Sequence, residues 1–136
     1  MYQVIIADDE AKIRSGLANL FPWNQLGFEI TGSFSNGRDA YDFALSNPVD
    51  LILSDIRMPI MNGLELAKTC REKYGRIPLF IFLTSYEEFQ LIKEAMTYEA
   101  VDYLIKLELS ASSLADAVKK AKNRLENLQA VVKAKD

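Results

Sequence analysis

Residues 51–59, LILSDIRMP, place three aliphatic residues directly before Asp55, and Pro59 follows four positions later. Consecutive aliphatic residues are typical of a strand that is buried on both faces, as in the centre of a parallel sheet. A carboxylate at the end of such a strand must be solvated, paired with a cation or used in chemistry. The rest of the sequence bears on which of these roles Asp55 has.

The composition of the whole chain indicates one globular domain. With 136 residues, of which 49% are hydrophobic, the chain is long enough for one core. Its net charge is −3, and no run of Lys or Arg provides a footprint for nucleic acid. A single cysteine, no leader segment and no long apolar run predict a cytoplasmic protein that does not enter a membrane. The absence of histidine excludes Ser/His and Cys/His catalysis and His-ligated metal within this chain.

Short apolar runs alternate along the chain with segments of helical periodicity. The runs predict strands at 4–7, 30–34, 51–53, 79–83 and 101–105. The helices predicted between and after them are marked by Ile13, Leu17 and Leu20; by the range 37–46; by Leu64, Ala67, Cys70 and Tyr74, ended by Gly75; by Phe89, Ile92 and Met96; and by Ser113, which opens the last helix in a capping box with Asp116.

Five strand and helix units in alternation predict an α/β fold, a doubly wound parallel sheet with helices on both faces. The run at 79–83 is apolar on both faces and predicts a central strand, whereas the mixed run at 30–34 and the short one at 101–105 predict edges. Ligands of such sheets bind beyond the carboxyl ends of the strands. The residues at these ends are therefore the candidates for function.

Four of the five predicted strands end in residues that can take part in chemistry. Asp8 and Asp9 follow the first strand, Asp55 the third, Thr84 the fourth and Lys106 the fifth. Carboxylates held close together repel each other, so a cation is expected among them, and oxygen ligands without His or Cys favour Mg²⁺. An ammonium and a hydroxyl beside them can hold the oxygens of a phosphoryl group. The set predicts a site where an aspartate is phosphorylated.

The joint spacing of these residues resembles the receiver domain of two-component response regulators. The resemblance covers about residues 2–122 and is carried by Asp8 and Asp9, Asp55 with Met58, Pro59 and Gly63, Thr84, and Tyr103 three residues before Lys106. The segments NQLGFEITGSFSNGRDA, DLILSDIRMPIMNGLEL and FLTSYEEFQLIKEAMTYEAVDYLIK look most like receivers fused to an AraC-type helix-turn-helix output domain. The resemblance implies a five-stranded (βα)5 flavodoxin-like (CheY-like) fold with strand order 2-1-3-4-5. It also implies control of transcription through a DNA-binding output domain that lies outside this chain.

The resemblance also implies a role for each residue of the site. Asp55 would accept a phosphoryl group from a partner histidine kinase, which agrees with the lack of histidine here. Mg²⁺ would be held by Asp9 and Asp55, by Asp8 through water, and by the backbone carbonyl of Arg57. Lys106 would pair with a phosphoryl oxygen. Thr84 and Tyr103 would move together as the switch between two packings.

Each residue has a simpler explanation when it is taken alone. Asp8 and Asp9 could cap the first helix, Thr84 could be an N-cap, Lys106 a solvated strand end and Tyr103 an edge aromatic. Their joint order along the chain favours the receiver. Two other functions stay open: a pseudo-receiver that acts as a protein-interaction module without phosphorylation, and a Mg²⁺-dependent phosphohydrolase with an aspartyl nucleophile. The phosphohydrolase would need a second acid two residues after the nucleophile, where this chain has Arg57.

Two positions depart from the family pattern. Leu107 follows Lys106 where the family has a proline joined by a cis peptide bond, so this bond is either trans with a different loop or strained cis. Glu99 stands where a glycine usually ends the fourth helix, and it must adopt a left-handed backbone or end the helix differently. Both positions flank the fourth helix, fifth strand and fifth helix, a surface through which a homodimer could form.

The C-terminal segment continues the helical pattern past the expected receiver. We expect a receiver over 1–122 and, over 123–136, an extension of the last helix that serves as a linker to the output domain. A heptad seam supports this expectation, with apolar residues at Leu114, Val118, Ala121, Leu125, Leu128 and Val132. The seam could pair with a second copy, or its first half could simply pack on the sheet while the rest frays.

Overall fold

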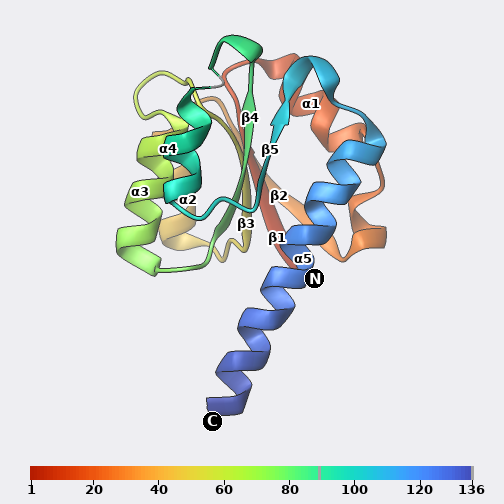
Figure 1. Cartoon of the computed structure of the whole chain (residues 1–136), viewed down its shortest axis with the longest axis vertical. Coiled ribbons are helices and arrows are strands. Elements are labelled where there is room, and N and C mark those ends of the chain that lie inside the picture. Colours follow the sequence, from red (N-terminus) through yellow and green to blue (C-terminus); the bar gives the residue numbers. More distant parts are fainter. Residues whose placement is uncertain (89, 136) are drawn as a thin grey trace.

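The computed structural model describes residues 1–88 and 90–135. In the last helix it describes side chains only up to Val131. Five parallel strands form one sheet in the order β2-β1-β3-β4-β5, as the resemblance implied (Figure 1). The predicted edge strands, β2 and β5, lie at the two edges. The strands are β1 (Tyr2–Ala7), β2 (Phe28–Phe34), β3 (Leu51–Asp55), β4 (Leu79–Thr84) and β5 (Asp102–Ile105).

Helices cover both faces of the sheet, which confirms the doubly wound arrangement. One face packs against α1 and α5 and the other against α2, α3 and α4 (Figure 1). Strands β3 and β4 are buried at every position, because helices lie against both of their faces. The helices are α1 (Ala11–Asn19), α2 (Gly37–Ser46), α3 (Gly63–Tyr74), α4 (Leu91–Thr97) and α5 (Ala111–Lys135).

The start of α5 differs from the prediction, which placed a capping box at Ser113 and Asp116. The helix begins earlier, at Ala111, and Ser110 caps it. The Ser110 hydroxyl accepts a hydrogen bond from the Ser113 backbone N–H at 3.0 Å, and the Ser113 hydroxyl accepts one from the Ser110 N–H at 3.0 Å. Ser110 is therefore the N-cap of α5, and Ser113 occupies the N3 position of the capping box. The N3 position is usually filled by Glu or Gln.

Only the first part of the apolar seam of α5 is buried against the core of the domain. Leu114, Val118 and Leu125 are fully buried, and Leu128 is half-buried against the same core. The C-terminal turns of α5 extend away from the body of the molecule (Figure 1). The side chain of Val132, which would continue the seam, lies outside the described residues.

The prediction for α4 holds only in part. Ile92 is buried as expected, but Met96 is 46% exposed, and Phe89 lies outside the described residues. The helix spans seven residues. Ile92 and Ala95 are its buried residues, whereas Met96 is not part of the buried core. None of the helices in the described part of the chain has the length and hydrophobicity needed to cross a lipid bilayer.

Candidate functional site

The predicted site residues meet at the carboxyl edge of the sheet. Asp8 directly follows β1, Asp55 is the last residue of β3, Thr84 is the last of β4, and Lys106 directly follows β5. Because β1, β3, β4 and β5 are neighbours and parallel, these residues come from adjacent strand ends. Side chains up to 98 positions apart in sequence thereby converge on one rim.

Lys106 is the centre of this cluster. Its Nζ lies 3.0 Å from Asp55 Oδ2, 2.9 Å from Asp8 Oδ2 and 3.6 Å from Glu10 Oε1. Asp8 is fully buried and Asp55 is 4% exposed. One ammonium therefore serves two buried carboxylates, an arrangement in which positive charge is in deficit.

The electrostatics of the cluster reflect this deficit. Burial and then the Asp8 charge raise the pKa of Asp55 to about 7, although the hydrogen bond from Lys106 acts in the opposite direction. Burial likewise raises the pKa of Asp8. Burial alone would lower the pKa of Lys106, but its close contacts with the Asp8 and Asp55 carboxylates outweigh this effect and raise it. The lysine is therefore charged at neutral pH.

A compact acidic set lies beside Lys106, and its composition differs from the predicted ligand set. Carboxylate oxygens of Asp8, Asp9 and Glu10 all lie within 4.8 Å of one another. Asp8 Oδ1 accepts a hydrogen bond from the Glu10 backbone N–H at 2.9 Å, which folds the chain back at this point. Within the described residues Asp55 does not belong to this set, and its Oδ2 accepts a hydrogen bond from Lys106. Glu10 was not among the residues predicted for the site, although its position next to two aspartates was a signal for a third carboxylate.

The oxygen-only chemistry of this set fits a hard divalent cation such as Mg²⁺. Asp8 Oδ2 supports the fit, because it is buried and no hydrogen bond from the described residues satisfies it. The Lys106 ammonium lies 2.9 Å away, close enough for ionic attraction but outside hydrogen-bond alignment. A buried carboxylate oxygen without a hydrogen bond is unfavourable unless a cation or water reaches it.

Thr84 and Tyr103 lie on the adjacent strands β4 and β5. Thr84 is fully buried, and its hydroxyl donates a hydrogen bond to the Ser85 carbonyl at 3.0 Å. Tyr103 is half-buried, pairs with Phe82 in the register of the two strands, and packs against the core beneath α2, α3 and α4. The two candidate switch residues thus come from neighbouring strands.

The loop after Asp55 is shaped by close backbone packing. The Gly63 N–H donates to the Ile56 carbonyl at 2.8 Å, and a Cβ at Gly63 would clash with the Asp55 carbonyl oxygen. Glycine is therefore required at this helix start. Arg57 is largely exposed, and its Nε lies 3.3 Å from Glu88, an ion pair that links this loop to the segment after β4.

The two departures from the family pattern are resolved by the backbone. The single cis peptide bond in the described part of the chain joins Ile77 to Pro78, so the Lys106–Leu107 bond is trans. A short 3-10 turn over Lys106–Glu108 follows, with Leu107 85% exposed. Glu99 adopts the left-handed conformation at φ 58°.

The comparisons with known proteins agree with this geometry. Residues 4–119 match the family described as the response regulator receiver domain. The chain belongs to this family. The receiver domain of AraT, a response regulator from Geobacillus stearothermophilus, is 38% identical with a TM-score of 0.88, covering 94% of this chain and 98% of that one. For the two-component transcriptional regulator AraC from Clostridium phytofermentans ISDg, the identity is 30% and the TM-score 0.86, covering 96% and 99% of the two chains.

Relatives of this receiver domain include longer regulatory proteins. The uncharacterized transcriptional regulatory protein YesN of Bacillus subtilis (strain 168) is 37% identical over 106 residues, which is 78% of this chain and 28% of YesN. The receiver domain spans between 28% and 46% of the length of the curated relatives that it matches. Its resemblance to AraC-type regulators, expected from sequence, is confirmed by the relatives' own descriptions.

Proposed function

We propose that this receiver domain accepts a phosphoryl group on Asp55 from a partner histidine kinase and thereby switches its conformation. One observation carries the proposal. The Asp55 carboxylate ends a central strand, is almost fully buried, and has one oxygen held by the Lys106 ammonium. A cation placed at a buried carboxylate can stabilise the extra negative charge that a phosphoryl group brings.

In this reaction a carboxylate oxygen of Asp55 attacks the phosphorus of a phosphohistidine on the kinase. A P–O bond forms, the P–N bond breaks, and its electron pair stays with the departing imidazole. Lys106 then pairs with an oxygen of the acyl phosphate, and the Thr84 hydroxyl gives up its bond to the Ser85 carbonyl to reach another. Self-catalysed transfer and slow hydrolysis of the acyl phosphate are the only chemistry proposed for the domain.

Mg²⁺ would be held by Asp9 and Asp55, by Asp8 through water, and by the Arg57 carbonyl, and Glu10 belongs to the same acidic set. When bound, the ion supplies positive charge that favours the ionised form of Asp55 and balances the charge of the phosphoryl group. This role suits a carboxyl whose pKa is raised to about 7 by burial and by the Asp8 charge. Without added positive charge, a large part of Asp55 is protonated at neutral pH and is a poor nucleophile.

The conformational response runs through Thr84 and Tyr103. Movement of the Thr84 hydroxyl toward the phosphate leaves space on the β4 side, and Tyr103, already half-buried on β5, turns inward to fill it. The phosphate drives this change only through the contacts that it gains in the second packing. The surface of α4, β5 and α5 changes with it.

The signalling context follows from the family and from α5. The receiver occupies about residues 1–122, and residues 123–136 extend α5 as a linker toward a DNA-binding output domain of AraC type, which controls transcription in the cytoplasm. The receiver itself binds no nucleic acid and no membrane. Homodimer formation occurs through α4, β5 and α5 or through the extended helix.

The test is incubation with a small-molecule phosphodonor and Mg²⁺, followed by intact-protein mass spectrometry. The wild-type chain should gain one phosphoryl group, and Asp55→Asn should gain none. Asp116→Asn is the matched control, because Asp116 is an exposed carboxylate on α5. An unmodified wild-type chain would replace this proposal with the pseudo-receiver, and an adduct on Asp55→Asn would place the modification elsewhere.

A further inference from the structure

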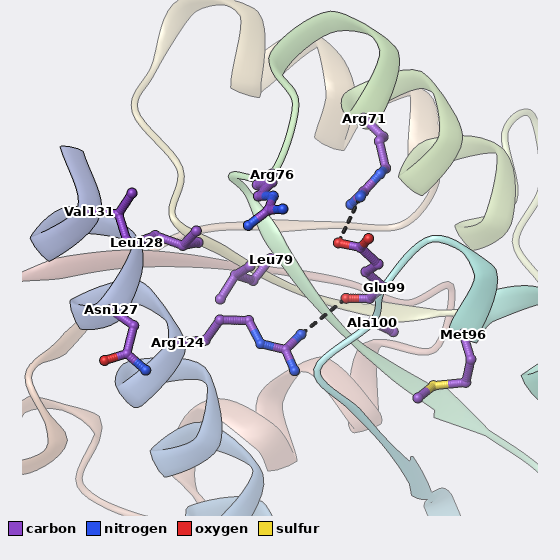
Figure 2. A pocket seen from close by; sticks show the side chains of 10 residues that line it. All are labelled: Arg71, Arg76, Leu79, Met96, Glu99, Ala100, Arg124, Asn127, Leu128 and Val131. Carbon is purple, nitrogen blue, oxygen red and sulfur yellow. Dashed lines mark hydrogen bonds and ion pairs between the residues drawn. The ribbon is translucent and has the colours of Figure 1, made fainter. Parts of the chain in front are cut away.

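A cavity of about 500 Å³ lies at the end of the sheet opposite to Asp55. It is bordered by the start of β4, the turns before β4 and β5, and the second half of α5, whereas Asp55 lies at the carboxyl ends of the strands. The proposed phosphorylation chemistry uses none of its residues. Those that matter most are Arg71, Arg76, Arg124, Glu99, Leu128 and Val131 (Figure 2).

The charge of this cavity is opposite to that of the whole chain. Three guanidinium groups and one carboxylate line it, so the lining carries a net charge of +2 in a chain whose net charge is −3. Figure 2 shows the three arginines arranged around Glu99, each coming from a different segment. Such a local excess of one sign concentrates ligands of the opposite sign.

The single carboxylate is already committed to one arginine. Arg71 pairs with Glu99 Oε2 at 2.7 Å, and its hydrogen bond is the main cause of the lowered pKa of Glu99. Among the residues that the structure describes, Arg124 donates a hydrogen bond only to the Glu99 backbone carbonyl, at 3.3 Å. Arg76 makes no hydrogen bond or ion pair with any residue in the described part of the chain. The charges of Arg76 and Arg124 also act on Glu99 from a distance, but neither guanidinium forms an ion pair with a carboxylate in the described part of the chain.

Apolar side chains form the other side of the same cavity. Val131 is 53% exposed and Met96 46%, which places both among the most exposed large apolar side chains that the structure describes, and Leu128 beside them is half-buried. Leu79 and Ala100 add buried apolar surface at the base. Apolar lining with a few convergent charged groups is the usual composition of a small-molecule site, and about 500 Å³ lies within the usual range of about 300–1,000 Å³.

We propose that this cavity binds a small organic anion. Its carboxylate or phosphate head pairs with Arg76 and Arg124, because a planar guanidinium matches either group with two parallel hydrogen bonds. Its apolar body covers Leu128 and Val131 and removes exposed apolar surface from water. The cavity is separate from the Asp55 site, since it lies at the other end of the strands, and its binding of an anion needs no divalent cation.

The test uses the whole chain in EDTA, without Mg²⁺, and follows amide chemical shifts by ¹H–¹⁵N correlation spectroscopy. Octanoate and octyl phosphate supply a head and a body, inorganic phosphate supplies the head alone, and octyl glucoside supplies the body without charge. We expect the two amphipathic anions to bind about tenfold more tightly or better than phosphate or the glucoside. The shifts should centre on Arg76, Ala100 and Leu128. The tighter of octanoate and octyl phosphate identifies whether the head is a carboxylate or a phosphate.

Charge-removing variants assign the binding to the arginines. Arg76→Gln and Arg124→Gln should each weaken the binding of the amphipathic anions by about tenfold, the size of one charge-assisted contact. Arg38→Gln is the matched control, because Arg38 is exposed on α2 and paired with Asp42 at 3.3 Å. Shifts that centre on Lys106, equal binding of the uncharged glucoside, or unchanged affinity in both variants would each overturn the proposal. Since Mg²⁺ and phosphodonor are absent, the outcome is separate from that of the phosphorylation test.

Discussion

Removal of the Asp55 charge should stabilise the protein when divalent cations are absent. Asp55 and Asp8 are both buried at the carboxyl edge and share one ammonium, so one negative charge is poorly compensated. Asparagine has nearly the shape of aspartate without the charge. The substitution Asp55→Asn therefore removes unfavourable charge burial while it keeps a polar group near Lys106.

The magnitude follows from the pKa of Asp55. Burial, followed by the Asp8 charge, raises this pKa from 3.8 to about 7. Each pKa unit corresponds to about 1.4 kcal/mol, so the charged form is disfavoured in the folded protein by at most about 4 kcal/mol. Local relaxation and entry of water reduce this figure, and we expect Asp55→Asn to raise the free energy of unfolding by about 2 kcal/mol at pH 8. For a chain of this length, that gain raises the melting temperature by roughly 8 °C.

The pH dependence has a defined sign. The folded-state pKa of Asp55 lies above its ordinary value, so the folded protein holds this proton more tightly than the unfolded chain does. The free energy of unfolding of the wild type should fall as pH rises from about 4 to about 7, and this contribution should be constant above that range. The advantage of Asp55→Asn should thus be small at about pH 4.5 and complete at pH 8.

Urea denaturation at both pH values, in EDTA, measures the difference between the two proteins. The control is Asp116→Asn, an exposed position where we expect a change within about 0.5 kcal/mol at either pH. If Asp55→Asn were destabilising at pH 8, or if its gain were the same at both pH values, the inferred charge deficit around Lys106 would be refuted.

Four further predictions use the same protein. Lys106→Ala should lower the free energy of unfolding by about 3 kcal/mol at pH 8, because two buried carboxylates lose their shared cation, and the loss measured by urea denaturation should shrink near pH 4. Ile60→Gly should raise it by about 0.5–1 kcal/mol, because Ile60 is 80% exposed and held at φ 70°, a conformation unfavourable for a β-branched residue; a loss of stability would show that its side chain packs usefully. By contrast, Glu99→Gly, also at positive φ, should give no gain in the same assay, since it removes the 2.7 Å pair with Arg71. Mg²⁺ at about 100 times its dissociation constant should stabilise the wild type by about 2.7 kcal/mol in thermal melts, and Asp9→Asn should reduce this effect strongly, whereas an equal response of both proteins would place the ion elsewhere.

The fold and the place of the site could be predicted because each signal is local in the chain and the sheet brings the signals together. Aliphatic runs such as 51–53 identify buried strands, and strict alternation with helices makes the strands parallel. Parallel strands present their carboxyl ends at one edge of the sheet. Asp55 and Lys106 could therefore be predicted to lie near each other before any interatomic distance was known.

Details that depend on side-chain reach could not be predicted in this way. Asp55 accepts a hydrogen bond from Lys106, and the compact acidic set contains Glu10 rather than Asp55, details of side-chain placement that spacing along the chain does not determine. The start of α5 was misplaced by three residues because serines at 110 and 113 can both cap, and reciprocal hydrogen bonds select the first. Met96 follows the periodicity of α4 but is 46% exposed, because periodicity does not tell how much of a helix face its neighbours cover.

The most direct test of the central claim is to locate the phosphoryl group in the chain. After treatment with a phosphodonor and Mg²⁺, borohydride reduction converts an aspartyl phosphate into homoserine, and peptide mass spectrometry finds the altered residue. We predict homoserine at position 55 in the wild type and at no other acidic position. Homoserine at position 8 or 9, or an unchanged peptide 51–59 in a chain that has gained a phosphoryl group, would contradict the assignment of Asp55 as the phosphoacceptor.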